Sequence, residues 1–334
     1  MSDQRRRPVA HHLAVLVLFA LLTLVVTYPL SLQLSTHLAG DDYDVWARPW
    51  ATWWTRKAIS EGHGLYETDM LFHPRGVSLV YHSFSHVNTA VALLLEPLIG
   101  VVAAHNVTVL LAYILSGFSM TILVRDLTES EGAGVAAGLI FAFSTYHVDQ
   151  SSHLIILSTQ WLPLWMLFIM RLLRDPPHVR WSGRLLVQTG LAALFLVLTA
   201  LSSWHLLIFS VLWLVVYVVH AALWRRARLT WINLSAVAVM GVVVLLLISP
   251  LLLPLIRARL GGDAQRWLGV PVDEAHSTDV LAFFVPSRRH PVFGALVEPL
   301  HERIGRRQVF LAYVPLALAV FGALTGGLRA RVSM

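Results

Sequence analysis

The chain contains no cysteine, and Lys57 is its only lysine. Without cysteine it forms no disulfide and has no thiolate to serve as nucleophile or metal ligand. Charge is also scarce, at 13% of 334 residues, whereas about 25% is usual in soluble domains. Apolar side chains make up 57% of the chain, and the mean hydropathy is +0.67. These proportions exclude an ordinary soluble domain and predict an all-α polytopic membrane protein.

Several common catalytic signatures are missing as well. The sequence has no P-loop, no G-x-S-x-G elbow, no H-E-x-x-H motif and no dinucleotide-binding fingerprint. The net charge of +6 comes almost wholly from arginine, and in a membrane protein this excess indicates topology rather than nucleic-acid binding. Function therefore has to be inferred from the polar residues between the apolar segments.

Eight segments are apolar and long enough to be predicted as membrane spans, which need about 20 residues. The first is predicted to be an uncleaved helix, because its apolar run exceeds that of a signal peptide and no cleavage site follows. A G-x-x-x-G pair, Gly134 and Gly138, predicts close helix contact in the third span, and Pro250 and Pro254 predict a kink in the seventh. The predicted spans are 11–33, 104–124, 133–148, 156–173, 185–202, 204–223, 231–256 and 309–327.

Arginine clusters fix the predicted orientation. They occupy the connectors after the fourth and sixth spans and follow the eighth, whereas 149–155 and 202–204 contain no lysine or arginine. The positive-inside rule then places the N-terminus in the cytoplasm. Segment 87–101 would invert this pattern if it crossed, so we predict a re-entrant or interfacial helix on the outer side. The chain 1–334 is thus one membrane module with large outer loops at 34–103 and 257–308.

The first outer loop begins with an acidic stretch that admits three interpretations. Asp41, Asp42 and Asp44 could cap the following helix, bind a divalent cation such as Mg or Mn, or supply a general base. Capping needs only one aspartate. Trp46, Trp50, Trp53 and Trp54 follow with helical spacing and predict a helix lying flat on the outer leaflet, kinked or split at Pro49.

Further polar clusters are predicted on the same face. Around a Pro-Gly turn, Arg75 is a candidate phosphate ligand with the histidines nearby, because guanidinium pairs well with phosphate. The connector after the third span is rich in hydrogen-bonding groups, and the late loop carries arginines beside an apolar run. The candidate substrate- or phosphate-binding residues are His73, Arg75, His82, His147, Asp149, His153, Arg288 and Arg289.

These stretches resemble the GT-C superfamily of membrane glycosyltransferases, and most of all its bacterial group similar to dolichyl-phosphate-mannose-protein mannosyltransferases. The likeness covers nearly the whole chain, although each motif is short. Many members continue into a further C-terminal part, so the resemblance implies a short or truncated form. The matching stretches are 40–54 (GDDYD, then W and WW), 71–82 (LFHPRGVSLVYH), 138–164 (GLIFAFSTYHVDQSSHLIILSTQWLPL) and 277–291 (STDVLAFFVPSRRHP).

The resemblance implies an enzyme of the bacterial cytoplasmic membrane. It would transfer a sugar from a polyprenyl-phosphate donor to an extracytoplasmic acceptor, with inversion at the anomeric carbon. The family's catalytic base, sometimes with a divalent metal, falls on Asp41 or Asp44, with a slight preference for Asp41. A second acidic position falls near Asp149 or His153.

The alternative is a non-catalytic membrane protein for transport or assembly of lipid-linked glycans. A transporter should carry ionisable residues at the centres of its spans, and here those centres are nearly free of charge.

Overall fold

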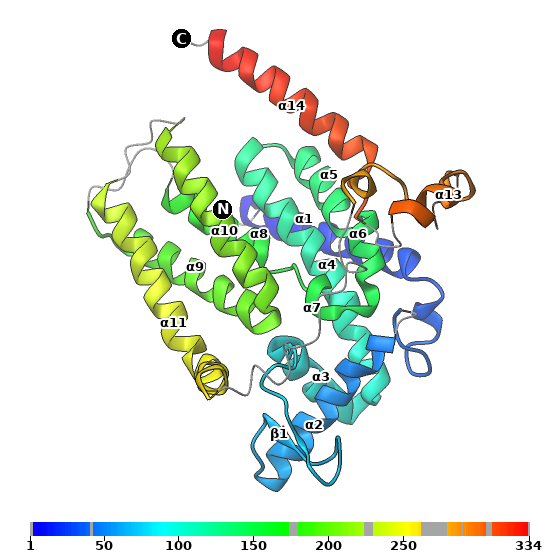
Figure 1. Ribbon diagram of the computed structural model, residues 1–334. Helices are drawn as coiled ribbons and strands as arrows, with labels where there is room; N and C mark the ends of the chain where they lie inside the picture. Colours follow the sequence, from blue (N-terminus) through cyan, green and yellow to red (C-terminus); the bar gives the residue numbers. More distant parts are fainter. Residues whose placement is uncertain are drawn as a thin grey trace.

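Long apolar helices dominate the computed structural model (Figure 1). It describes residues 3–40, 43–173, 180–223, 230–261, 279–288, 290, 292–304 and 309–332. Asp41, Asp42 and Arg289 lie outside these ranges. In this part of the chain, six helical stretches have the length and composition needed to cross a membrane, and they coincide with six of the eight predicted spans. They are α1 (Asp3–Val26), α4 (Val101–Thr128), α7 (Leu154–Leu157) together with α8 (Leu162–Leu172), α9 (Gly183–Ser202), α10 (Trp204–Leu223) and α11 (Trp231–Leu260).

The other two predicted spans have a different form. The segment predicted at 133–148 is broken into α5 (Glu131–Ala142) and α6 (Thr145–Asp149), followed by the 3₁₀ helix η3 (Gln150–Ser152). The last predicted span falls in α14 (Tyr313–Val332), which extends away from the other helices in Figure 1. The result agrees with an all-α polytopic membrane protein.

Segment 87–101 forms a separate helix, α3 (His86–Ile99), before Gly100 and α4. Its 14 residues reach about 21 Å at 1.5 Å per residue, less than the roughly 30 Å of hydrocarbon in a bilayer. This length agrees with the prediction that the segment does not cross. Leu94 and Leu98 are 76% and 81% exposed, so one side of α3 is apolar and uncovered.

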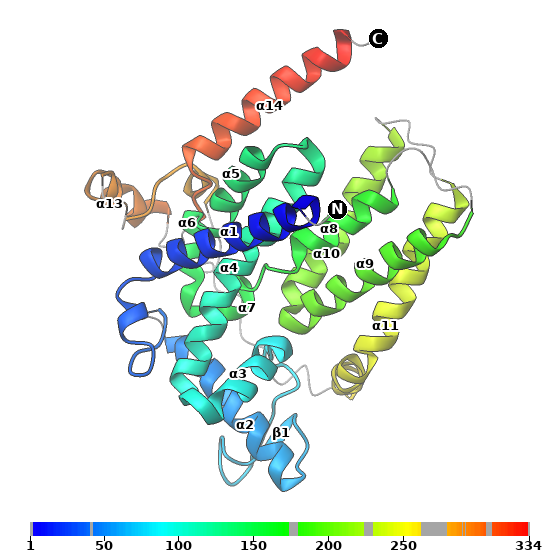
Figure 2. The same cartoon turned by 180° about the vertical axis from the view of Figure 1, so that it is seen from behind.

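The directions of α4, α5 and α8 show how the broken segment runs. Ser116 Oγ lies 2.9 Å from Thr159 Oγ1, and Asp126 near the end of α4 pairs with Arg171 near the end of α8. Helices α4 and α8 therefore run in the same direction. Consecutive spans joined by a short loop would run in opposite directions, so the chain has to return between these two. The segment between them returns along α4 as α5 and α6. Figure 2, the view from behind, shows α1 crossing in front of α4.

The G-x-x-x-G prediction is confirmed, because α5 packs closely on α4. A Cβ added at Gly138 would lie 2.5 Å from Gly117 O, and one at Gly134 would lie 2.8 Å from Thr121 O. Phe19 of α1 fills the same junction and is fully buried. The absence of side chains at these positions lets three helices meet.

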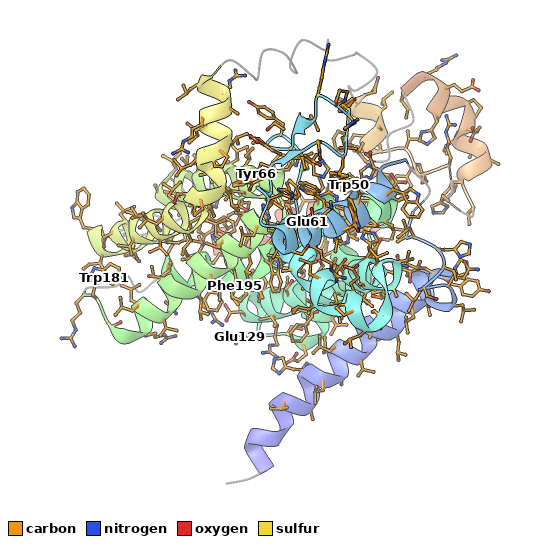
Figure 3. The ribbon with its side chains drawn as sticks, turned by 90° about the horizontal axis from the view of Figure 1, so that it is seen from below. Trp50, Glu61, Tyr66, Glu129, Trp181 and Phe195 are labelled. Atoms are coloured by element: carbon orange, nitrogen blue, oxygen red, sulfur yellow. The ribbon has the colours of Figure 1, made fainter. Side chains whose placement is uncertain are left out.

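Two apolar clusters hold the rest of the bundle. One joins α8, α9 and α11 around fully buried Trp165, whose ring meets that of Trp213 on α10 at 5.5 Å. The other joins α4 to α7 around Tyr113 and Leu157. Helix α11 contains Pro250 and Pro254, and Figure 3 shows its last turns at a steep angle to the rest, as the predicted kink requires.

A small hairpin unit follows η1 (Leu30–Leu32) and η2 (Tyr43–Trp46). It consists of α2 (Ala47–Glu61), β1 (Glu67–Thr68) and β2 (Val77–Ser78), with the two strands antiparallel. Pro49 lies in the first turn of α2 and does not split it, because the first-turn amides need no partner within the helix. The late segment contains η5 (Val280–Phe283) and α13 (Gly294–Ile304).

The four tryptophans predicted to face the membrane differ in burial. Trp54 is buried in the hairpin core and stacks on half-buried Trp50, whereas Trp46 and Trp53 are 63% and 42% exposed. The prediction of a four-tryptophan face lying on the membrane is therefore wrong for Trp50 and Trp54, which pack against Leu79 and Phe84.

The Gly138 junction gives a stability test. We expect Gly138→Ala to lower the free energy of unfolding by about 1–3 kcal/mol, because the added methyl meets backbone that cannot move aside. Gly132→Ala in the same helix meets nothing within 4 Å and should be neutral or stabilising by up to about 1 kcal/mol. Thermal unfolding of the detergent-solubilised proteins compares the two. Equal melting temperatures would contradict the close α4–α5 contact.

Candidate functional site

A pocket of about 260 Å³ lies where the start of α2 meets the loop before α3 and the α6–α7 connection. Three segments far apart in sequence supply its walls, around positions 44–48, 81–83 and 152–155. The sequence predicted polar groups in each of these segments, and the structure brings three of them, Asp44, His82 and His153, into one pocket. Figure 3 looks onto this end of the bundle, with Trp50 labelled on α2.

Asp44 and His153 face one another in this pocket. A carboxylate oxygen, Oδ2 of Asp44, lies 3.4 Å from Nε2 of His153. The Asp44 side chain is 70% exposed and that of His153 is 29% exposed, so the carboxylate remains open to solvent and to a ligand. An exposed carboxylate beside an imidazole can accept a proton from a hydroxyl group.

Close backbone packing brings these two residues together. Gly40 has φ of +103°, and a Cβ there would lie 2.5 Å from Cβ of Ser152, the residue before His153. Only glycine combines this backbone conformation with such a close approach. Gly40, four residues before Asp44, is therefore packed directly against η3.

Asn106 anchors the stretch before Gly40. Its fully buried amide accepts a hydrogen bond from Ala39 N at 3.1 Å and donates to the carbonyl oxygens of Leu34 and His37 at 2.8 and 2.7 Å. These bonds tie the chain between α1 and η2 to the start of α4. Asn106 heads an Asn-Val-Thr glycosylation sequon, and its burial gives it this structural role instead.

Arg48 is the cation of the pocket, one helical turn after Asp44. Its guanidinium donates to Ser83 O and, at 3.2 Å, to Nε2 of His82. Burial lowers the pKa of Arg48 to about 10, and the nearby Asp44 carboxylate opposes this shift. The group remains charged at neutral pH, so the pocket pairs a fixed positive charge with a carboxylate. The spacing of four residues from Asp44 is the sequence signal that could have identified Arg48.

His82 acts as a neutral acceptor beside that cation. Burial, with a contribution from the positive charge of Arg48, lowers the pKa of His82 to about 4. Its ring also packs edge-on against Phe84 at 4.9 Å and Trp50 at 6.0 Å. His82 therefore positions the guanidinium without adding charge to the pocket.

Other predicted site residues lie elsewhere. His147 is buried, and its ring nitrogens lie 2.7 Å from Ala142 O and 2.8 Å from Leu157 O, so it holds backbone together rather than lining the pocket as a substrate ligand. Asp149 is half-buried at the end of α6 and does not line the pocket. Arg288 pairs with Glu298 at 3.0 Å in the late segment.

His73 and Arg75 belong to the hairpin unit. His73 is exposed in the turn between β1 and β2, and Arg75 lines a separate cleft of the hairpin. Neither residue lines the pocket at Asp44. The role of Arg75 as a phosphate ligand stays a prediction.

The structure bears on two of the three interpretations of the acidic stretch. Helix α2 begins after Trp46, which forms no side-chain capping bond, so Asp44 is not its N-cap. Within the described residues, no group of three or more carboxylate or histidine side chains is arranged to hold a metal ion. Asp44 and His153 alone do not make up a cation site, and Asp41 and Asp42 lie outside the described ranges. The predicted Mg or Mn site remains a prediction.

Comparison with known proteins adds no family assignment. The chain matches no protein-family model, and no curated protein or solved structure is significantly similar to it. The pocket and its residues are therefore the basis for inferring function.

The lowered pKa of His82 predicts a specific loss of stability in acid. In the unfolded chain its pKa is near 6.5, so between about pH 6.5 and pH 4 the unfolded state binds more protons than the folded state. Stability should fall as the pH drops through this range, and His82→Gln should make the fall shallower. Thermal unfolding measured from about pH 7 to about pH 4 tests this. His73→Gln, in an exposed turn, is the control, and identical profiles for wild type and His82→Gln would contradict the prediction.

Proposed function

We propose that the protein is a membrane glycosyltransferase that transfers a sugar from a polyprenyl-phosphate donor to an acceptor hydroxyl, with inversion. One observation carries the proposal: the exposed Asp44 carboxylate lies beside His153 in a pocket whose other wall holds the Arg48 cation. A general base and a phosphate-binding cation are the two groups that this transfer requires. The resemblance of 40–54 and 138–164 to membrane glycosyltransferases supports the same chemistry.

In the proposed reaction, the acceptor hydroxyl gives its proton to the Asp44 carboxylate as its oxygen attacks the anomeric carbon. The bond from that carbon to the donor phosphate breaks, and the phosphate leaves with the electron pair. Arg48 stabilises the developing negative charge, because its guanidinium is protonated and half-buried. His153 orients the carboxylate. Asp41 remains a candidate for the same role as base.

The site would act on the extracytoplasmic face of a bacterial cytoplasmic membrane. We infer eight crossings with the N-terminus in the cytoplasm, counting α5 with α6 and also α14. Support comes from the parallel directions of α4 and α8, which require a return between them. The pocket and the hairpin unit then lie at the outer end of the bundle, where a lipid-linked donor and a water-soluble acceptor meet.

Removing the carboxylate tests the chemistry. Asp44→Asn should lower the rate of transfer from a polyprenyl-phosphate sugar by about 10²–10⁴-fold, because the acceptor hydroxyl loses its base. Glu302→Gln removes an exposed carboxylate from α13 and should leave the rate unchanged. Loss of activity in Asp41→Asn but not in Asp44→Asn would reassign the base. Full activity in both variants would overturn the proposed mechanism, whereas no transfer by the wild-type protein would favour a non-catalytic role in glycan transport or assembly.

The absence of cysteine makes the topology directly testable. Single cysteines introduced as Ser60→Cys, Gly132→Cys and Trp181→Cys occupy exposed positions. A membrane-impermeant maleimide added to intact cells should label position 60 only, and all three after permeabilisation. Labelling of position 181 from outside would show that the segment containing α5 and α6 does not cross.

A further inference from the structure

The hairpin unit contains a larger cleft than the one at Asp44. Its volume is about 640 Å³, within the range of small-ligand sites. The second half of α2, the turn that follows it and both strands form its walls. Glu61 and Tyr66, labelled in Figure 3, mark the end of α2 and the chain leading into β1.

The walls of this hairpin cleft are fixed before any ligand binds. Trp54 is buried at its base, and its indole Nε1 donates to Leu65 O at 2.9 Å. Gly76 has φ of +68°, and a Cβ there would lie 2.8 Å from Thr68 O, so the two strands meet where no side chain fits. Phe72, at the tip, has a φ of +56°, a conformation that is unusual for a bulky residue. Such backbone outliers often accompany functional sites.

The charged residues that line the cleft fall into a paired set and an unpaired set. Lys57 and Glu61 form an ion pair at 2.5 Å, and His63 approaches the same carboxylate at 3.3 Å. The cleft is also lined by Glu67, Asp69 and Arg75, whose charged groups form no ion pair or side-chain hydrogen bond within the described ranges. Carboxylates and a guanidinium thus face one cleft with their hydrogen-bonding capacity unused.

This combination favours one class of ligand. A phosphate would meet three carboxylates, and a cationic ligand would meet Arg75 and Lys57. A neutral ligand rich in hydroxyl groups suits both signs, because carboxylates accept two hydrogen bonds and guanidinium donates two from adjacent atoms. We propose that the hairpin cleft binds a neutral carbohydrate chain, with Asp69 and Arg75 as its principal ligands.

The position of the cleft connects it to the pocket at Asp44. Both are built on α2, and the nine residues from Arg48 to Lys57 correspond to roughly 14 Å along the helix axis. A chain held in the cleft would reach along α2 toward the carboxylate. That this carbohydrate is the acceptor rests on the proposed function; its binding does not.

Binding measured apart from transfer tests the inference. The full-length wild-type protein, purified in detergent, is applied to an array of neutral oligosaccharides, and the best binder is titrated by calorimetry. Asp69→Asn and Arg75→Gln should each weaken binding about tenfold, because each removes a charged hydrogen-bonding group. Glu129→Gln, an exposed carboxylate at the opposite end of the bundle, should leave the affinity unchanged. Matching melting temperatures show that the variants are folded.

The outcomes separate this inference from the proposed function. Oligosaccharide binding that depends on Asp69 and Arg75, without sugar transfer, would overturn the proposed glycosyltransferase function and support carbohydrate binding in the hairpin cleft. Sugar transfer by a protein that binds no neutral oligosaccharide would support the proposed function and overturn carbohydrate binding in the cleft. Displacement of the oligosaccharide by an equal concentration of inorganic phosphate would show an anion site and overturn the inference.

Discussion

The structure depends on satisfying backbone groups where helices end inside an apolar bundle. A broken helix leaves carbonyl oxygens without partners, and lipid offers none. Buried His147 helps to meet this need: its ring nitrogens lie beside Ala142 O and Leu157 O, at the ends of α5 and α7, and the nitrogen that carries the proton can donate to its carbonyl. Asn88 of α3 donates to Ser158 Oγ at 2.6 Å in the same region. These bonds let the chain leave the helical path between α5 and α8, and that departure carries His153 to Asp44.

The sequence predicts the long helices well and the broken ones poorly. Hydropathy alone identifies the six long helical stretches. The glycine spacing at Gly134 and Gly138 predicts a close helix contact, which α5 forms with α4. The break after Ala142 depends on hydrogen bonds to His147 and on packing with α4, which hydropathy does not register. Trp50 and Trp54 follow the same helical spacing as Trp53, yet they pack on protein because the hairpin folds over that side of α2. Periodicity identifies a face but not what covers it.

The candidate site was partly foreseeable for the same reason. Asp44, His82 and His153 each attract notice as polar residues in predicted outer segments, but their meeting results from contacts over about a hundred residues of sequence, such as Gly40 against Ser152. In the sequence, His147 and His153 look alike, because both are histidines in the same polar connector, yet His147 has a structural role. What separates the two is burial, because His153 keeps one side open to the pocket while His147 is enclosed.

Helix α2 has a mechanical consequence. It is continuous from Ala47 to Glu61, and Arg56 ties it to Glu96 of α3 at 2.8 Å. Arg48 near one end and Lys57 near the other cannot change their separation without breaking hydrogen bonds within the helix. The pocket at Asp44 and the hairpin cleft are therefore joined by one rigid helix. Any tilt of α2 against the bundle shifts both openings together and preserves the distance between them.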